Sequence, residues 1–219
     1  MRILIGMETS GEIRRAFADC GWFAVSVDLL PSEDCPMGPL QQHWIGDVRD
    51  YLDRDDWDMF IFHPSCTYLT SSAAWAFKDV QTKNIKPGTL IGAARRAMRE
   101  KAIDEIREIW RRSDYIPKRC MENPIGSLST RFRQPDQIIQ PWGFGDDASK
   151  ATCLWLDGLD PLQPTKYVAP RIVNGKKRWA NQTDSGQNRV APSPDRWRVR
   201  SRTYSGIAKA MADQWGNVP

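Results

Sequence analysis

The sequence has only two histidines among its 219 residues, and its five cysteines form no Cys-x-x-Cys pair. Zinc sites and redox dithiols need such residues at close spacing, so we expect no metal site. An odd number of cysteines also argues against a disulfide framework and fits free thiols in a reducing compartment. Four of them are interpreted as structural: Cys20, Cys35, Cys120 and Cys153.

Long apolar runs are missing as well. The longest unbroken runs are far shorter than the roughly 20 residues of a membrane span, and Met1–Gly6 is too brief for a signal peptide. We therefore expect a cytoplasmic protein with no membrane partner. With 219 residues, 41% of them hydrophobic, the chain can bury the core of one globular domain and a small appendage. The oligomeric state is not predicted.

Charge is unevenly distributed. Residues 166–204 hold ten Lys or Arg and two Asp, a local charge of +8, whereas the whole chain carries only +4. The remainder is therefore mildly acidic at −4. A basic segment on an acidic body suggests a polyanionic partner such as a nucleic acid, because Lys and Arg displace counterions from phosphates. A solvated loop explains the same charge equally well.

Apolar residues recur as short runs and as longer helical stripes. The runs predict strands at residues 2–5, 22–27, 43–48, 57–62, 118–122 and 150–156. The stripes predict helices at residues 12–20, 89–112 and 205–215, the last with Ser205 as its N-cap. This alternation predicts an α/β fold with three layers around a mostly parallel sheet, in which ligands bind at the carboxyl ends of the strands.

A glycine-punctuated turn, Gly6-Met7-Glu8-Thr9-Ser10-Gly11-Glu12, follows the first predicted strand. It lacks the three glycines of a dinucleotide-binding loop, and its acidic side chains would repel a pyrophosphate. A cationic, phosphate-free ligand such as S-adenosylmethionine fits better. An ordinary turn between a strand and a helix is the alternative. The residues assigned to this ligand are Gly6, Glu8, Ser10 and Gly11.

Two aspartates follow the next strands in order. Asp28 ends the second strand, where a carboxylate can accept the hydroxyls of a ribose. Asp47 follows the third, where it could accept a hydrogen bond from an adenine amino group. Each aspartate alone would more simply be a turn residue. Their position after the glycine loop favours a shared cofactor site.

A thiol and a carboxyl group follow the next two strands. Residues 57–62 end in His63-Pro64-Ser65-Cys66, and residues 118–122 end in Glu122-Asn123-Pro124. Carbon 5 of cytosine becomes nucleophilic once a thiolate adds at carbon 6, and a carboxyl group can exchange a proton with ring nitrogen 3. Cys66 and Glu122 suit these roles, and Asn123 would hold the loop. The alternatives are a buried structural cysteine and a surface carboxylate. His63 is expected to satisfy a loop carbonyl.

Taken together, these motifs resemble the cytosine-5 DNA methyltransferase family in its compact phage and prophage form. Pro64-Ser65-Cys66 is similar to the family's Pro-Cys loop, Glu122-Asn123 to its Glu-Asn dipeptide, and Asp28 to its acidic residue after the second strand. The resemblance implies a Rossmann-like methyltransferase domain, S-adenosylmethionine as cofactor with Pro64 beside it, and DNA as substrate. A phage-encoded protein of this kind would work in the host cytoplasm.

The resemblance also suggests a division of the chain. Residues 1–156 would form the cofactor-binding catalytic domain, residues 157–203 a basic, irregular nucleic-acid-binding segment, and residues 204–219 a helix that packs back on the catalytic domain. Ser65 departs from the family pattern because it separates Pro64 from Cys66. The large target-recognition domain is missing. Residues assigned to the substrate are Lys150, in place of a family arginine, and Arg178, Trp197, Arg198 and Arg200 of the basic segment.

Other functions remain open at this stage. The same thiol chemistry serves enzymes that modify carbon 5 of a free pyrimidine nucleotide. A catalytically inactive DNA-binding protein could also keep this fold. Amino methylation is less favoured, because it needs an Asn or Asp before a Pro-Pro-aromatic loop, and His63-Pro64-Ser65-Cys66 offers none.

Overall fold

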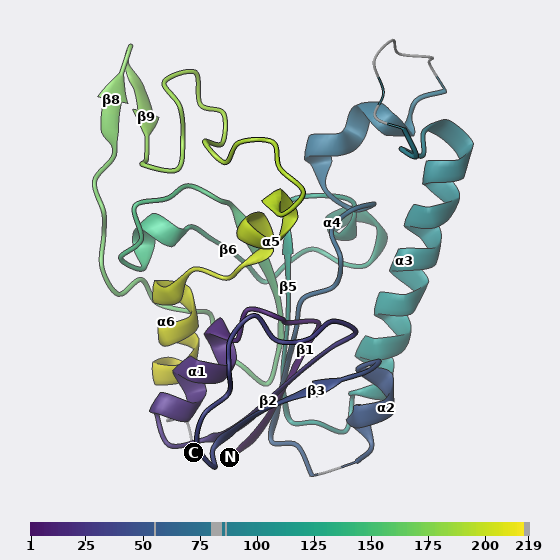
Figure 1. Cartoon of the computed structure of the whole chain (residues 1–219), viewed down its shortest axis with the longest axis vertical. Coiled ribbons are helices and arrows are strands. Elements are labelled where there is room, and N and C mark those ends of the chain that lie inside the picture. Colours follow the sequence, from purple (N-terminus) through teal and green to yellow (C-terminus); the bar gives the residue numbers. More distant parts are fainter. Residues whose placement is uncertain (55, 80–84, 86, 217–219) are drawn as a thin grey trace.

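A computed structural model describes residues 1–54, 56–79, 85 and 87–216. Seven strands form one mixed sheet in the order β3-β2-β1-β4-β5-β7-β6 (Figure 1). Their bounds are β1 Arg2–Gly6, β2 Phe23–Asp28, β3 Gln41–Ile45, β4 Met59–Phe62, β5 Lys118–Pro124, β6 Gln137–Ile139 and β7 Thr152–Asp157. The chain therefore has the Rossmann-like α/β fold that the sequence predicted.

The strand directions bring several loops to one edge of the sheet. Strands β1 to β5 run parallel, and β7 runs antiparallel to both β5 and β6. Gly6 of β1 lies level with Phe62 of β4, which in turn lies level with Met121 of β5. The winding reverses between β1 and β4, and ligands of such sheets bind outside the carboxyl ends of the strands at this switch point.

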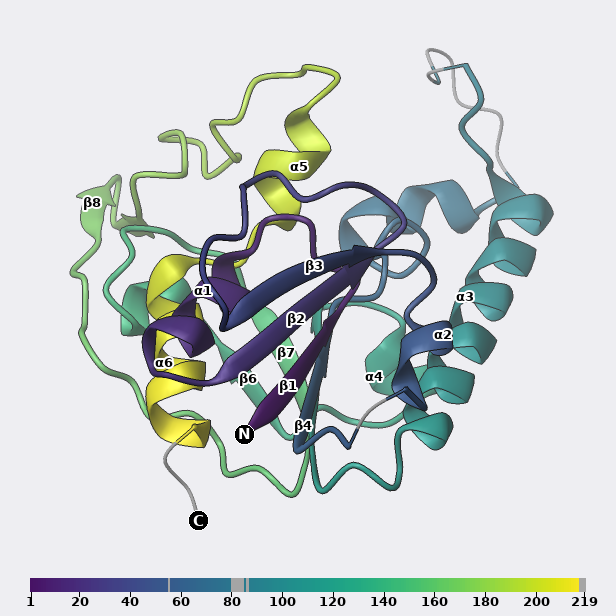
Figure 2. The same ribbon diagram turned by 60° about the horizontal axis from the view of Figure 1, so that its bottom comes forward.

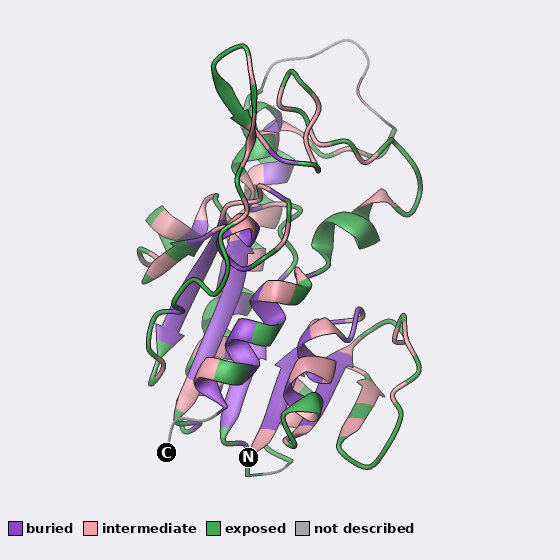
Figure 3. Ribbon diagram, turned by 90° about the vertical axis from the view of Figure 1, so that its left-hand side faces the viewer, coloured by how far each residue is buried: buried purple, intermediate pink, exposed green. Residues whose placement is uncertain are grey.

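Helices cover both faces of the sheet (Figure 2). Helices α1 (Glu12–Asp19) and α6 (Ser205–Trp215) pack together on one face. The other face is covered by α2 (Arg49–Leu52), α3 (Gly92–Arg112) and α4 (Leu128–Arg131). The central strands are buried along their length, as Figure 3 shows, because both of their faces lie under helices. None of the helices in the described part of the chain combines the length and apolar character that a membrane crossing requires.

Residues 157–203 contain more regular structure than the sequence indicated. β8 (Arg171–Val173) and β9 (Lys176–Arg178) form a hairpin, and α5 (Arg196–Ser201) follows. The hairpin turns through Asn174 and Gly175, which both have positive φ, as tight two-residue turns require. No residue of α5 is buried. Figure 1 shows the hairpin and α5 above the carboxyl edge of the sheet, well separated from each other.

The predicted elements agree with the structure at their cores and differ at their ends. The third strand lies at Gln41–Ile45, earlier than residues 43–48, and the long helix begins at Gly92. Several elements escaped prediction because they are too short to show a clear repeat of apolar residues. These are α2, α4, β6, β8, β9, α5 and the 3₁₀ helices η1 (Ser71–Phe77) and η2 (Pro141–Gly143).

The expected cap of the last helix is wrong. Ser205 is the first residue of α6, and the helix has no cap from its own flanking side chain. Instead Asp146, from the segment before β7, accepts hydrogen bonds from the Gly206 backbone N–H at 3.0 Å and the Ser205 hydroxyl at 3.3 Å. A carboxylate from elsewhere in the fold thus satisfies the helix terminus.

Candidate active site

The loop that carries Cys66 follows β4. The carbonyl of Cys66 accepts hydrogen bonds from the backbone N–H groups of Leu69 and Thr70, both at 3.0 Å, so a tight turn begins at the cysteine. The Ser65 hydroxyl lies 3.0 Å from that of Thr67 and braces the same turn. Ser65, which separates Pro64 from Cys66, therefore has a local structural role. Cys66 itself reaches the surface.

Glu122 lies near the end of β5 and is only 8% exposed. His63 Nδ1 lies 2.8 Å from its Oε2 atom. Burial raises the pKa of Glu122, but the hydrogen bond from His63 and the charge of Lys150 outweigh burial, so that the pKa falls below its ordinary value. A buried carboxylate is thus kept ionised. The expectation that His63 satisfies a loop carbonyl is wrong, since its partner is this carboxylate.

The loops after β4 and β5 are fastened to each other. The Asn123 side-chain amide donates to the carbonyl of Pro64 at 2.7 Å. Further along, Thr70 and Gly126 form a β-bridge, and a side chain at Gly126 would collide with the backbone of Leu69. The two segments that deliver the thiol and the carboxylate therefore form one unit. This matches the role expected for Asn123, whereas Pro64 contributes its carbonyl to this contact.

Lys150 brings a positive charge to the same place from the segment before β7. Its charge lowers the pKa of both Cys66 and Glu122. Asn181 holds this segment by pairing with the backbone N–H of Ser149 at 2.9 Å and its carbonyl at 3.0 Å. The charge of Lys150, a residue assigned to the substrate, thus acts on both Cys66 and Glu122, two of the residues assigned to catalysis.

The thiol of Cys66 is not activated in this arrangement. Partial burial raises its pKa above the ordinary value, the charge of Lys150 opposes this rise, and the charge of Glu122 adds to it. The charge of Arg200, from α5, also lowers the pKa. Cys66 is therefore mostly protonated at neutral pH, and the charges of Lys150 and Arg200 favour its thiolate.

The turn after β1 holds an unpaired buried carboxylate oxygen. Glu8 is 5% exposed, and its Oε1 accepts hydrogen bonds from the Ile13 backbone N–H at 2.9 Å and the Ser10 hydroxyl at 3.2 Å. Its Oε2 has no hydrogen-bond partner among the described residues. A buried carboxylate oxygen without a donor is costly, so this atom suits a cationic or hydrogen-bond-donating ligand. The residues here fit the sulfonium and amino group of S-adenosylmethionine.

The glycines and the serine of this turn shape it. Gly6 has no room for a side chain, because a Cβ atom would lie 2.8 Å from Val48. Gly11 has φ +69°, a left-handed conformation that favours glycine, and a Cβ atom there would crowd the Asp34 carboxylate. The Ser10 hydroxyl is occupied within the turn. Their direct contact with a cofactor stays a prediction.

Asp28 and Asp47 lie at neighbouring strand ends, since the backbone N–H of Gly46 donates to the Asp28 carbonyl at 2.9 Å. The Asp28 carboxylate accepts one bond from the Leu30 N–H at 2.9 Å, and burial raises its pKa. Asp47 differs, because Arg49 engages both of its oxygens and lowers its pKa. Asp28 thus remains suited to a ribose diol, whereas an adenine amino group would compete with Arg49 for Asp47.

Helix α5 places only part of the basic segment near the site. Besides Arg200, it presents Trp197, which is 49% exposed, and the Arg198 guanidinium lies 5.3 Å from that indole ring. Arg178 lies apart in the β8–β9 hairpin, where it bonds to the carbonyl of Asp184 at 3.1 Å. The structure therefore separates Arg178 from the other three residues assigned to the substrate in this segment.

Two residues important to the site were missed by the sequence interpretation. His63 was assigned the wrong partner, although its position between a buried strand and a proline loop was a usable signal. Arg95 is only 6% exposed, and its Nη2 donates to the Thr67 carbonyl at 2.6 Å. Its guanidinium also lies 5.2 Å from the ring of Tyr68. A charged residue within the apolar stripe of the long helix was the only available hint.

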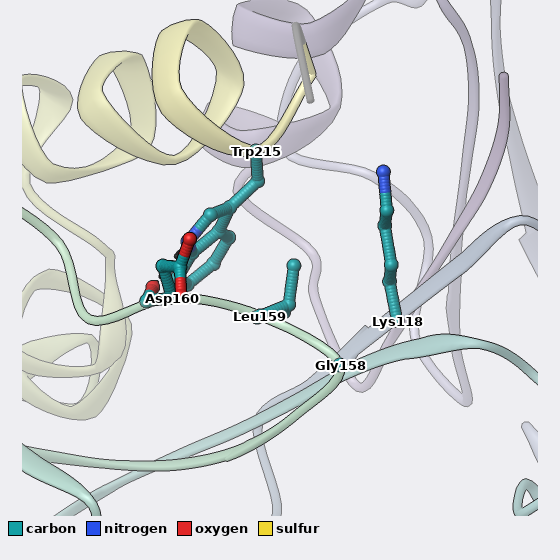
Figure 4. A pocket seen from close by; sticks show the side chains of 5 residues that line it. All are labelled: Lys118, Gly158, Leu159, Asp160 and Trp215. Atoms are coloured by element: carbon teal, nitrogen blue, oxygen red, sulfur yellow. Dashed lines mark hydrogen bonds between the residues drawn. The ribbon is translucent and has the colours of Figure 1, made fainter. Parts of the chain in front are cut away.

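A separate hollow lies at the opposite end of the sheet (Figure 4). Lys118, at the start of β5, lines it together with residues 158–160 and Trp215, whose indole N–H donates to the Asp160 carbonyl at 2.9 Å. None of the residues assigned to chemistry lines it. No group of three or more His, Cys, Asp or Glu within the described ranges is arranged to hold a metal.

Comparison with protein families finds no match, and comparison with curated proteins finds none either. The function must therefore be argued from the site itself. A thiol and an ionised carboxylate lie at the carboxyl ends of the adjacent strands β4 and β5, beside a turn with an unpaired carboxylate oxygen. Lys150, just before the antiparallel strand β7, acts on both groups through its charge. Together, these side chains can add a nucleophile to an electron-poor ring and exchange a proton with that ring.

Proposed function

We propose that this protein transfers a methyl group from S-adenosylmethionine to carbon 5 of cytosine in DNA, through a covalent bond between Cys66 and the ring. The observation that carries the proposal is the hydrogen bond of 2.7 Å from the Asn123 side chain to the Pro64 carbonyl, which ties the loop of Cys66 to the end of β5 where Glu122 lies. The charge of Lys150 acts on both Cys66 and Glu122. These three residues come from three different strand ends, and Cys66 and Glu122 are the residue types that this chemistry requires. The Rossmann-like sheet, with its switch point between β1 and β4, supports a cofactor site beside them.

The steps follow from the residues present. As the Cys66 sulfur forms a bond to carbon 6, its thiol proton passes to the ionised Glu122 carboxylate, which delivers a proton to nitrogen 3. The electron pair of the 5,6 double bond thereby makes carbon 5 nucleophilic. S-adenosylmethionine supplies an electrophilic methyl group to carbon 5. Loss of the carbon-5 proton then expels the Cys66 thiolate, nitrogen 3 returns its proton to Glu122, and the aromatic ring is restored. Lys150 stabilises the anionic forms of both side chains.

On the cofactor side, Glu8 would accept a hydrogen bond from the ligand's amino group through its unpaired oxygen, and Asp28 would accept the ribose hydroxyls. On the substrate side, α5 would meet DNA. Its arginines suit phosphates, and the half-exposed Trp197 can stack on a base. An enzyme that acts on a base ring must take that base out of the duplex, so a stacking side chain near the site is useful.

The decisive experiment measures transfer of a labelled methyl group from S-adenosylmethionine to duplex DNA, single-stranded DNA and deoxycytidine monophosphate. We expect transfer to DNA by the wild type and none by Cys66→Ser. Cys35→Ser is the matched control, because Cys35 is also an exposed thiol but lies in another loop. Transfer that survives in Cys66→Ser would refute the mechanism.

DNA containing 5-fluorocytosine separates the main proposal from its alternative. The fluorine cannot leave as a proton does, so the bond to Cys66 would persist and shift the protein in a denaturing gel. Trapping by the free fluorinated nucleotide but not by DNA would instead indicate an enzyme of nucleotide metabolism. Binding of DNA without trapping or transfer would indicate an inactive DNA-binding protein.

A further inference from the structure

The largely buried His63 and the buried Glu122 form a pair. His63 Nδ1 and Glu122 Oε2 are 2.8 Å apart, and their side chains are 12% and 9% exposed. His63 lies three residues before Cys66 in the same loop, whereas Glu122 comes from the neighbouring strand β5. The contact therefore fixes the carboxylate relative to the segment that carries the thiol.

The surroundings of the His63 imidazole indicate which of its two nitrogens carries the proton. His63 Nε2 is buried and has no hydrogen-bond partner among the described residues. If the proton were on Nε2, a buried N–H group would have no acceptor, which costs more than leaving a ring nitrogen without a donor. The proton of the neutral ring therefore belongs on Nδ1. Nδ1–H is then the donor, and the ionised carboxylate is the acceptor.

The other titratable groups that act on Glu122 do not replace this donor. Lys150 contributes a positive charge from the segment before β7. The thiols of Cys66, Cys120 and Cys153 feel the Glu122 charge, which raises the pKa of each of them. Within the described part of the chain, His63 is the side chain that forms a hydrogen bond with the carboxylate.

We infer that His63 is a positioning residue that fixes Glu122 through Oε2 and so leaves Oε1 as the oxygen that exchanges a proton with the substrate ring. The inference rests on the proposed function for the identity of that ring. The pair itself is a property of the free protein. His63 also offsets the cost of burying the carboxylate, which lets Glu122 stay ionised before the substrate arrives.

The test is the pH titration of the Glu122 carboxyl carbon, followed by NMR in protein labelled with ¹³C at glutamate side chains. Glu122→Gln identifies the signal by its loss. His63→Leu keeps a branched apolar volume without a donor, whereas His63→Asn places an amide N–H close to the position of Nδ1. His43→Leu is the control, because the other histidine bonds to Ser26 and Leu30 instead.

We expect the Glu122 titration to move to higher pH in His63→Leu, to return toward the wild-type position in His63→Asn, and to stay in place in His43→Leu. A titration that is unmoved in His63→Leu, or equally displaced in both His63 variants, would overturn the inference. This readout requires no methyl transfer. A wild type without activity would refute the proposed function and leave the titration decisive for His63.

A second test measures how the rate of trapping by 5-fluorocytosine DNA depends on pH, and it links the His63–Glu122 pair to function. If His63 positions Glu122 for proton exchange, the acid limb of the profile moves in the same direction as the titration in His63→Leu. A profile identical to that of the wild type, with the titration displaced, would show that the pair serves the fold only and would also overturn the inference.

Discussion

The side-chain amide of Asn123 donates to the carbonyl of Pro64 over 2.7 Å and joins the two loops that carry the candidate nucleophile and carboxylate. Cys66 follows Pro64 by two residues, and Glu122 immediately precedes Asn123. Asn123 is 2% exposed, so the bond is shielded from water. The relative position of thiol and carboxylate thus depends on a contact between side chain and backbone as well as on the sheet.

Asn123→Ala should remove this fastening and leave the Pro64 carbonyl without its donor. We expect a loss of about 1–3 kcal/mol in the free energy of unfolding, because a buried polar group would be left unpaired. The rate of trapping by 5-fluorocytosine DNA should fall by more than the loss of folded protein explains. Urea unfolding and gel-shift rates measure the two effects. Unchanged values in both would show that the loops are held without this bond.

Arg95, from α3, also supports the Cys66 loop, through its bond to the Thr67 carbonyl and its contact with Tyr68. Arg95→Lys should weaken the loop, because an ammonium group lacks the planar surface and forked donors of a guanidinium. We expect faster alkylation and proteolysis near Cys66.

Arg99→Lys is the matched control for this prediction. Arg99 lies one turn further along α3 and packs at 4.8 Å on the ring of Phe77 without contacting the Cys66 loop. Equal effects of the two substitutions, measured by peptide mapping after brief protease and iodoacetamide exposure, would contradict a specific role for Arg95.

Alkylation of Cys66 should increase with pH. Burial raises the pKa of its thiol, and only the thiolate reacts, so the rate rises as the pH approaches and passes this elevated value. Lys150→Met should move the rise to still higher pH, because the Lys150 charge favours the thiolate. Iodoacetamide labelling in a Cys20→Ser, Cys35→Ser background measures this. Lys176→Met, in the β8–β9 hairpin, should leave the profile in place.

Only part of the basic segment should contribute to DNA binding. Arg200→Ala should weaken DNA binding similarly for different sequences and reduce the slope of log affinity against log salt by about 1, as expected for one lost phosphate contact. Arg178→Ala should have a smaller effect, because its hairpin lies apart from α5. Fluorescence anisotropy over a salt series measures both. A larger effect of Arg178→Ala would place the DNA on the hairpin instead.

The end of helix α5 is also attached to the turn that follows β1. Arg202, just after the helix, bonds to Glu33 at 2.7 Å, and Glu33 accepts a bond from the Thr9 hydroxyl at 2.7 Å. Burial raises the pKa of Glu33, but the bonds from Arg202 and Thr9 outweigh burial and leave the pKa below its ordinary value of 4.5. The attachment is therefore complete above pH 4.5. It is lost as the pH falls through the pKa that Glu33 has in the folded protein, which is lower than 4.5.

Hydrogen exchange of residues 196–203 tests this attachment. Glu33→Gln should expose them to faster exchange than the wild type at pH 6, and the two proteins should converge under acidic conditions, where Glu33 of the wild type is protonated. Asp184→Asn is the control, because Asp184 pairs with Arg171 in the hairpin region. Identical exchange of wild type and Glu33→Gln at pH 6 would show that α5 is held by other contacts.

The sequence by itself determined the main elements of the sheet and the ends at which reactive residues lie. Apolar runs such as Met59–Phe62 define buried strands locally, and Pro64 and Pro124 limit how far each strand continues. It follows directly that Cys66 and Glu122 lie in or near loops at carboxyl ends of strands. The positions of strands and of the residues that end them depend on neighbouring residues in the chain, so they can be predicted from one sequence.

Only the tertiary structure decided which of these residues meet. The pairing of β4 with β5 brings His63 to Glu122, and the antiparallel entry of β7 brings Lys150 to both. The path of the chain after β7 also decided that the charge of Arg200, in α5, acts on Cys66, whereas Arg178 lies in the β8–β9 hairpin. Such contacts join segments far apart in the chain, and they depend on how apolar faces pack together, which local periodicity does not encode.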